Sequence, residues 1–216
     1  MTTIKTRLCF VRHGETAWNA EQRMQGHKDL PLNEDGLAQA EQAAHYFISQ
    51  QVAALYSSDL QRAQQTARPI GEVLNLSVAL LPELRERNYG RCEGMIRSEI
   101  VAVYPEDARA LRERLPDYVV PGGESIRQHQ QRVLECVGRL ARAHAGQAIV
   151  IVTHGGVLDL VYRHATGMAL EKRRDFPIPN TGINWLTICG EDWQIDSWAE
   201  TAHLGERGAI EVTANF

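Results

Sequence analysis

Two stretches of the sequence run from a short apolar segment directly into a histidine followed by a glycine. LCFVRHGETAW (residues 8–18) places Arg12 and His13 after one apolar run, and AIVIVTHGGVLDL (residues 148–160) places His154 after another. A buried strand needs neither a guanidinium nor an imidazole at its end. An imidazole can act as a nucleophile or proton carrier, and a guanidinium binds oxyanions through paired N–H donors. These residue types at strand ends indicate a site for an anionic ligand.

A fourth candidate cation is Arg62, which lies in SSDLQRAQQTA (residues 57–67), one or two turns into an expected helix. A lone helix arginine is usually solvated, but this one follows the end of a predicted strand. Two arginines and two imidazoles around one point repel each other unless an anion neutralises them, and a phosphoryl group fits that requirement. The alternative, that His13 and His154 are zinc ligands, needs a third ligand at suitable spacing, and we find no convincing one.

The elements that must position these residues alternate along the chain. An apolar run that ends in turn or capping residues predicts a strand, and apolar residues at helical spacing predict a helix. Asn33 is a suitable N-cap, and Ser57, Ser58 and Asp59 are residue types that cap the next helix. Strands are predicted at 8–11, 53–56, 77–81, 148–152, 183–188 and 193–198, and helices from 33, over 60–74 and 124–144, and after 156.

This order predicts an α/β fold, a three-layer sandwich with a mostly parallel central sheet and helices on both faces. Ligands of such sheets bind beyond the carboxyl ends of the strands, where the two histidines fall. The segment of about 85–123 differs, because it is rich in charge and broken by glycines and prolines. We interpret it as a small helical lid insertion within a single domain that spans 1–216.

Composition narrows the classes of partner. The 216 residues carry a formal net charge of −4, which argues against nucleic acid or an anionic membrane bound by bulk charge. No apolar run approaches the roughly 20 residues of a transmembrane helix, and we expect a cytoplasmic protein. The scattered cysteines (Cys9, Cys92, Cys136 and Cys189) are expected to be reduced, three of them buried in apolar segments. A homodimer through the C-terminal hairpin or its tryptophans (Trp185, Trp193 and Trp198) stays open.

The residues also resemble a known family. Arg12-His13-Gly14-Glu15-Thr16 is similar to the signature of the histidine phosphatase superfamily, in its phosphoglycerate mutase-like branch. The likeness continues in the family's order to about residue 203, through QGHKDLPLNEDGLAQA, SSDLQRAQQTA, LRERNYGRCEG, PGGES, VTHGGVL and ETAHL.

The resemblance implies specific site residues. His13 would be the nucleophile and would carry the phosphoryl group as a phosphohistidine, while Arg12, Arg62 and His154 would complete the phosphate pocket without a metal. The proton donor would be Glu86, in LRERNYG; from the residues alone, its rivals Glu15, Glu83 and Glu93 cannot be separated from it. The positions expected to contact substrate beside these are Asn19, Gln25, Gly26 and Gly155. The other histidines carry no functional signal: His27 is expected in an exposed loop, and His45, His129, His144 and His164 on helix faces.

The substrate is expected to be a small phosphate ester. The compact lid favours hydrolysis of small phosphorylated metabolites, such as phosphoglycerate-like acids, because acidic neighbours (Glu106, Asp107, Glu113 and Asp117) should neutralise its arginines (Arg109, Arg112 and Arg114). The alternative is a phosphoglycerate mutase that needs 2,3-bisphosphoglycerate as its cofactor; otherwise no cofactor is expected. The third alternative is a non-catalytic module that only binds phosphate. An arginine beside Glu86 (Arg85, Arg87 or Arg91) that points into the cleft would select a second anionic group.

Overall fold

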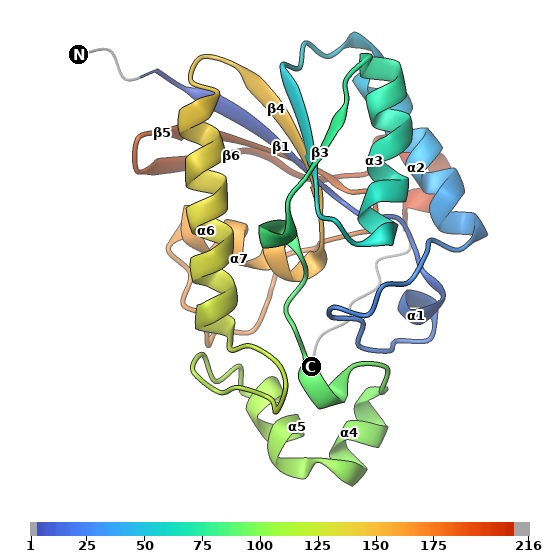
Figure 1. The fold of residues 1–216 in the computed structure, drawn as a ribbon, viewed down its shortest axis with the longest axis vertical. Coiled ribbons are helices and arrows are strands. Elements are labelled where there is room, and N and C mark those ends of the chain that lie inside the picture. Colours follow the sequence, from blue (N-terminus) through green and yellow to red (C-terminus); the bar gives the residue numbers. More distant parts are fainter. Residues whose placement is uncertain (1–3, 210–216) are drawn as a thin grey trace.

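A six-stranded sheet runs through the middle of the protein, in the order β3-β2-β4-β1-β5-β6 (Figure 1). The structure is a computed structural model and describes residues 4–209. The first four strands of that order are mutually parallel, and β5 pairs antiparallel with both β1 and β6, so only β5 runs against the others and the sheet is mostly parallel as predicted. The strands are β1 (Thr6–Arg12), β2 (Ala54–Ser57), β3 (Val78–Leu80), β4 (Ala148–Thr153), β5 (Ile183–Cys189) and β6 (Asp192–Glu200).

Helices cover both faces of this sheet, which confirms the predicted three-layer α/β fold (Figure 1). On one face lie α2 (Glu34–Tyr46) and α3 (Gln61–Leu74), and on the other α6 (Ile126–Ala143) and α7 (Gly155–Thr166). Side chains alternate along a strand, so Leu8 and Phe10 of β1 join the core under α6 and α7. Cys9 and Val11 join the core under α2 and α3.

The sequence predicted caps for the helices α2 and α3, and only the first of these predictions is confirmed. The side chain of Asn33 accepts a hydrogen bond from the backbone of Gly36 at 2.7 Å and caps α2, as predicted. The prediction that Ser57, Ser58 and Asp59 cap α3 is wrong, because the N-cap is Leu60, and the first N–H of the helix donates instead to the carboxylate of Asp29 at 2.6 Å. The sheet extends further than the apolar run suggested, and the Ser58 backbone still donates to a carbonyl of β4. Both serines are therefore buried at the end of the sheet.

The segment over 85–123 carries two short helices, α4 (Arg97–Val103) and α5 (Pro105–Arg112), placed beyond one end of the sheet (Figure 1). It has its own small apolar cluster, to which Cys92, Ile100 and Val120 belong. A further helix, α1 (Ala17–Ala20), was not foreseen; it begins at a Thr16 capping box immediately after the first histidine motif. The 3-10 helices are η1 (Phe47–Ser49), η2 (Pro82–Leu84), η3 (Gly90–Cys92) and η4 (Ala202–Ala209).

The cysteines and tryptophans mostly follow the expected burial. None of the four cysteines is in a disulfide; Cys9, Cys92 and Cys136 are buried, whereas Cys189, expected to be buried, is only half-buried near the hairpin turn. Trp185 is buried, and Trp193 and Trp198 pack half-buried against the core under α6 and α7. The homodimer stays a prediction. Within residues 4–209, no helix is both long and apolar enough to cross a membrane.

Candidate active site

His13 and His154 come together because β1 and β4 are parallel neighbours. Arg12 at the end of β1 is in register with Thr153 at the end of β4, so the next residue of each strand emerges at the same place. The His13 backbone N–H donates to the Thr153 carbonyl at 2.9 Å, and the two imidazole centroids lie 5.1 Å apart. Both side chains are buried, with 3% of His13 and 0% of His154 exposed.

The imidazole of His13 is held in one tautomer. Its Nδ1 lies 2.7 Å from the carbonyl oxygen of Gly14, and because a carbonyl can only accept, Nδ1 must carry the hydrogen. In the neutral ring the lone pair is then on Nε2. Burial lowers the pKa of His13 well below its usual value, and the charges of Arg62 and Arg12 lower it further. The ring is therefore neutral near pH 7, the state in which Nε2 can attack an electrophile.

Arg12 and Arg62 are buried cations beside this ring, oriented by backbone carbonyls. Arg12 donates from Nη1 to Ile178 at 2.6 Å, and Arg62 donates from Nη2 to Gly26 at 2.8 Å and from Nη1 to Lys28 at 2.9 Å. The Nε of each has no hydrogen-bond partner among the described residues. Burial lowers the pKa of each guanidinium to about 10, so both stay charged at neutral pH. Unpartnered buried donors of this kind suit an oxyanion.

His154 and the start of α7 add N–H groups to the site beside the two guanidinium groups. It is the N-cap of α7, and neither of its ring nitrogens has a hydrogen-bond partner within the described part of the chain. Burial lowers the pKa of its imidazole well below the usual value. Gly155 follows, and a Cβ there would lie 3.6 Å from Nε of Arg12. The backbone N–H groups at the start of this 12-residue helix add to the potential that attracts an anion.

Glu86 is the carboxylate that the fold places in this site. Its Oε2 accepts from the backbone N–H of Gly156 at 2.9 Å, and its Oε1 accepts from that of Arg87 at 2.8 Å. It also lies close enough to Arg12 and Arg62 to interact with their charges.

The three rival glutamates have other partners. Glu15 accepts from the Asn33 side chain, Glu83 pairs with Arg139, and Glu93 accepts from backbone N–H groups of the loops around it.

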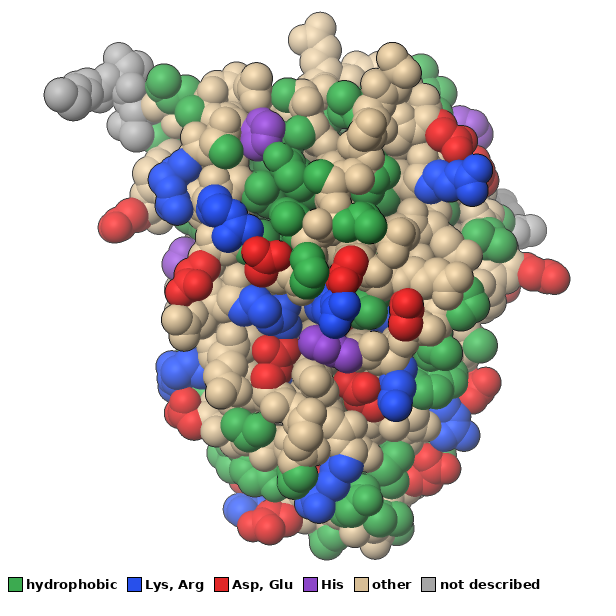
Figure 2. Space-filling model, in the orientation of Figure 1, with side chains coloured by type: hydrophobic (Ala, Val, Ile, Leu, Met, Phe, Trp, Pro, Cys, Tyr) green, Lys and Arg blue, Asp and Glu red, His purple; other side chains and the backbone are tan. Residues whose placement is uncertain are grey.

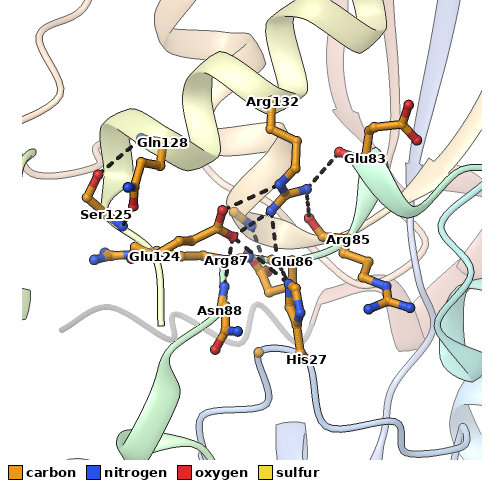
Figure 3. Close-up of polar contacts among 12 residues, drawn as sticks. His27, Glu83, Arg85, Glu86, Arg87, Asn88, Glu124, Ser125, Gln128 and Arg132 are labelled. Atoms are coloured by element: carbon orange, nitrogen blue, oxygen red, sulfur yellow. Dashed lines mark hydrogen bonds and ion pairs between the residues drawn. The ribbon is translucent and has the colours of Figure 1, made fainter. Parts of the chain in front are cut away.

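A network behind Glu86 holds its backbone in place (Figure 3). Arg132 of α6 donates to the carbonyls of Glu83 at 2.7 Å, Arg85 at 3.0 Å and Glu86 at 3.3 Å, and pairs with the Glu124 carboxylate at 2.5 Å. Sequence reasoning missed Arg132.

His27 also supports this segment, with its Nε2 2.9 Å from the Glu86 carbonyl, so the expectation of an exposed loop histidine is wrong. The loop that carries it folds back against 86–88 instead of extending into solvent, and 28% of its side chain is exposed.

A cavity of about 670 Å³ opens from these residues toward the 85–123 segment. Asn19, Gln25, Gly26 and Gly155 line it, at the positions carried over from the resemblance. The Asn19 side-chain oxygen accepts from the backbone N–H and the hydroxyl of Thr16, which holds this side chain at the start of α1. Around the middle of the face in Figure 2, cationic and anionic side chains alternate between the sheet layer and the α4–α5 end. Among the lining residues that sequence reasoning did not assign to the site are Arg23, Arg97, Arg114, His129, Asp159, Arg173 and Arg174.

The arginines near Glu86 and in the lid separate into two groups. Arg85 pairs with Asp59 and Arg91 pairs with Asp107, so these two are engaged elsewhere. Arg87 lines the cavity, and its guanidinium also donates to the backbone carbonyls of residues 118 and 124. Arg109 and Arg112 pair with a lid glutamate, as expected. For Arg114 the expectation that acidic residues of the lid neutralise it is wrong.

Arg114 pairs with Asp159 of α7 at 2.6 Å, because the chain after α5 turns back onto α7 and not onto its own acidic residues.

His129, expected on a helix face without a functional role, lines the cavity, and the sequence did carry an indication of this. It lies three residues after Ile126 and four before Val133, on the apolar stripe of α6, and is 2% exposed. An ionisable residue on a buried stripe is unusual and indicates a polar cavity nearby. For Arg173 and Arg174 the only signal is the basic run EKRRD between α7 and β5.

Comparisons with known proteins agree with this geometry. The family model of the histidine phosphatase superfamily (branch 1) matches residues 8–201. Phosphoglycerate mutase-like protein 4 of Arabidopsis thaliana is 38% identical, over 94% of this chain and 89% of its own length. The metal-independent phosphoserine phosphatase of that plant is 35% identical, over 95% and 86%. The structure of Bacillus stearothermophilus YhfR superposes with a TM-score of 0.85 at 30% identity, over 92% of this chain and 99% of that one. The chain belongs to branch 1 of the histidine phosphatase superfamily.

Proposed function

We propose that the protein is a phosphomonoester phosphatase that acts on small phosphorylated metabolites, among them phosphoglycerate-like acids, through a phosphohistidine. One observation carries this proposal. The Nδ1–H of His13 is engaged by the Gly14 carbonyl, so the free lone pair is on Nε2, within a site that holds two buried guanidinium groups. A neutral nucleophile beside fixed cations suits attack on a dianionic phosphate.

In the first step Nε2 of His13 attacks phosphorus, and the bond between phosphorus and the ester oxygen breaks. Glu86, in its protonated form, gives its proton to the leaving oxygen, and the alcohol departs. Arg12, Arg62 and His154 hold the equatorial oxygens, on which charge is concentrated in the transition state. The phosphoryl group is then bonded to Nε2.

In the second step water attacks the phosphohistidine. Glu86, now ionised, takes a proton from that water, the bond between phosphorus and Nε2 breaks, and inorganic phosphate leaves. One carboxyl group thus serves as acid and then as base, and the enzyme returns to its starting state.

The two guanidinium groups supply positive charge that Mg²⁺ supplies in other phosphoryl-transfer enzymes, so the proposal includes no metal. One relative is itself described as metal-independent. Among residues 4–209, no group of three or more His, Cys, Asp or Glu side chains is arranged to hold a metal ion. Phosphate release should therefore continue at the same rate in the presence of EDTA.

A second candidate is a phosphoglycerate mutase that uses 2,3-bisphosphoglycerate. The observation that favours it is the set of further arginines in the cavity, which can hold a second anionic group: Arg23, Arg87, Arg97, Arg114, Arg173 and Arg174. At least three of them already have partners: Arg114 pairs with Asp159, Arg23 pairs with Glu99, and Arg87 donates to the carbonyls of Glu124 and Tyr118. We therefore favour hydrolysis.

The test is ³¹P NMR of purified protein with 3-phosphoglycerate, with and without 2,3-bisphosphoglycerate, and with a His13→Ala control. Free phosphate that disappears in the control supports the phosphatase. Conversion to 2-phosphoglycerate, stimulated by the bisphosphate, would assign the mutase activity instead. Binding of phosphate without turnover of any ester, and without a trapped phosphohistidine, would leave only a phosphate-binding module.

A further inference from the structure

His129 is a buried polar residue of the cavity that neither proposed step uses. It lies in the first turn of α6 and lines the cavity together with Ile126 and Leu160. Its ring rests against the bare face of Gly156, with Cε1 3.1 Å from the point where a Cβ would stand. The carboxylate of Glu86 crowds the same point. His129 therefore adjoins the group that would protonate the leaving oxygen.

The protonation of this ring follows from its partners. The backbone carbonyl of Arg85 forms a hydrogen bond with His129, and Nε2 has no partner within the described residues. Since a carbonyl only accepts, Nδ1 carries the hydrogen. Burial lowers the pKa of the imidazole well below its usual value, with Arg132 and Arg87 lowering it further, so the ring is neutral. Nε2 is thus a buried acceptor without a donor, which is costly unless a ligand supplies one.

We infer that His129 is a specificity-determining residue whose Nε2 accepts a hydrogen bond from a hydroxyl on the carbon next to the ester carbon of the substrate. The inference rests on the proposed function, in which the leaving oxygen lies at Glu86. A substituent on the adjacent carbon then lies beside the imidazole of His129, which adjoins Glu86. The positive charges of Arg132 and Arg87 oppose an ammonium at this point, and a methyl group would leave the acceptor unpaired.

Asp159 is the rival acceptor. It lies three residues beyond Gly156 on α7, and its Oδ1 is also buried without a partner among the described residues. Its Oδ2 accepts from Arg114 at 2.6 Å and from Arg163 at 2.9 Å. As an anion it would favour an ammonium over a hydroxyl, whereas the neutral His129 favours the hydroxyl. A substrate with a hydroxyl group and one with an ammonium group therefore distinguish His129 from Asp159 as the acceptor.

Three esters of nearly equal size test this: 2-hydroxyethyl phosphate, 2-aminoethyl phosphate and propyl phosphate. For the wild-type protein we expect kcat/KM for the hydroxyl ester to exceed that for the propyl ester by about tenfold, and also to exceed that for the amino ester. In His129→Leu the hydroxyl-to-propyl ratio should fall to about one. In His129→Gln, whose side-chain oxygen can take the place of Nε2, the preference should persist.

Several results would overturn the inference. A wild-type hydroxyl-to-propyl ratio near one would do so without any variant, and so would an unchanged ratio in a folded His129→Leu protein. Preference for the amino ester, abolished by Asp159→Asn, would assign the contact to Asp159. If no ester releases phosphate, the proposed function fails, and the dissociation constants of the three esters, measured by calorimetry, then decide the contact on their own.

Discussion

Gly156 and Glu86 touch through a contact that leaves no room for a side chain. The glycine N–H donates to Oε2 of Glu86 at 2.9 Å, and a Cβ on residue 156 would collide with Oε1. The carboxylate is thereby fixed at the start of α7, next to the two histidines. Gly156, although distant from Glu86 in the sequence, therefore determines the position of the Glu86 carboxyl group.

The substitution Gly156→Ala should therefore displace Glu86. Loss of a positioned acid–base group typically costs about 10²- to 10⁴-fold in rate, and we expect kcat to fall by about 10²-fold with a smaller change in KM. Steady-state kinetics with p-nitrophenyl phosphate measures this. Gly138→Ala is the control, because residue 138 lies on α6, is not among the residues that line the cavity, and its Cβ would meet only the flexible end of Arg142. Equal effects of the two substitutions would contradict the contact's importance.

The substitution Arg62→Lys tests whether positive charge alone suffices at this position or whether the planar guanidinium group is needed. Lysine keeps the positive charge but loses the planar fork that bonds Gly26 and Lys28 while presenting Nε to the site. We expect kcat/KM for a phosphate ester to fall by about 10²-fold. The comparison is with Arg68→Lys, at an exposed position of the same helix, which should change little. Activity of Arg62→Lys within twofold of wild type would show that charge alone suffices.

Arg132 should matter for both stability and rate. Arg132→Met removes the donor shared by three carbonyls and the partner of Glu124, and we expect about 2 to 3 kcal/mol less free energy of unfolding. Because Glu86 loses its support, kcat should fall more than KM rises. Urea unfolding and kinetics measure the two effects. Arg139→Met is the control on the same helix: its pair with Glu83 is exposed and should contribute under about 1 kcal/mol.

Acid should destabilise the fold through its buried imidazoles. The pKa values of His13, His129 and His154 are lowered by burial, so below about pH 6.5 the unfolded chain binds protons that the folded chain does not. The free energy of unfolding therefore falls as pH falls, by at most about 1.4 kcal/mol per histidine between neutral pH and pH 5.5, the limit set by protonation of the unfolded chain. Thermal unfolding in phosphate-free buffer tests this.

The matched variant for the acid effect is His129→Gln, which removes one of the three imidazoles. On the same acidification it should lose less free energy of unfolding than wild type, by at most about 1.4 kcal/mol. A stability that is unchanged between pH 7.5 and pH 5.5 would show that the three rings titrate alike in the folded and unfolded chain.

Much of the framework could be predicted from local patterns. The apolar runs before Arg12 and His154 are strands, Asn33 caps a helix, and the alternation of strands with amphipathic helices indicates a layered, mostly parallel sheet. Strand and helix periodicity and capping act over a few residues, so the sequence alone reveals them. Because parallel strands end at one edge of a sheet, His13 and His154 could be expected to meet there.

Glu86 required more than local pattern. Four glutamates were chemically equivalent in the sequence, and only the resemblance to a family singled out this one. The structure separates them by their partners, since Glu86 alone of the four accepts from the start of α7.

By itself, then, the sequence determined the strands, the helices and the two histidine-bearing ends. Only the tertiary structure decided that Gly156 supports Glu86, that Arg132 clamps its backbone, that Arg114 pairs with Asp159, and that His129 enters the cavity. These contacts join segments distant in sequence, and they depend on how the 85–123 segment folds back against α6 and α7. The physical reason is that local periodicity sets which face of an element is apolar, whereas the partner of that face is set by packing of the whole chain.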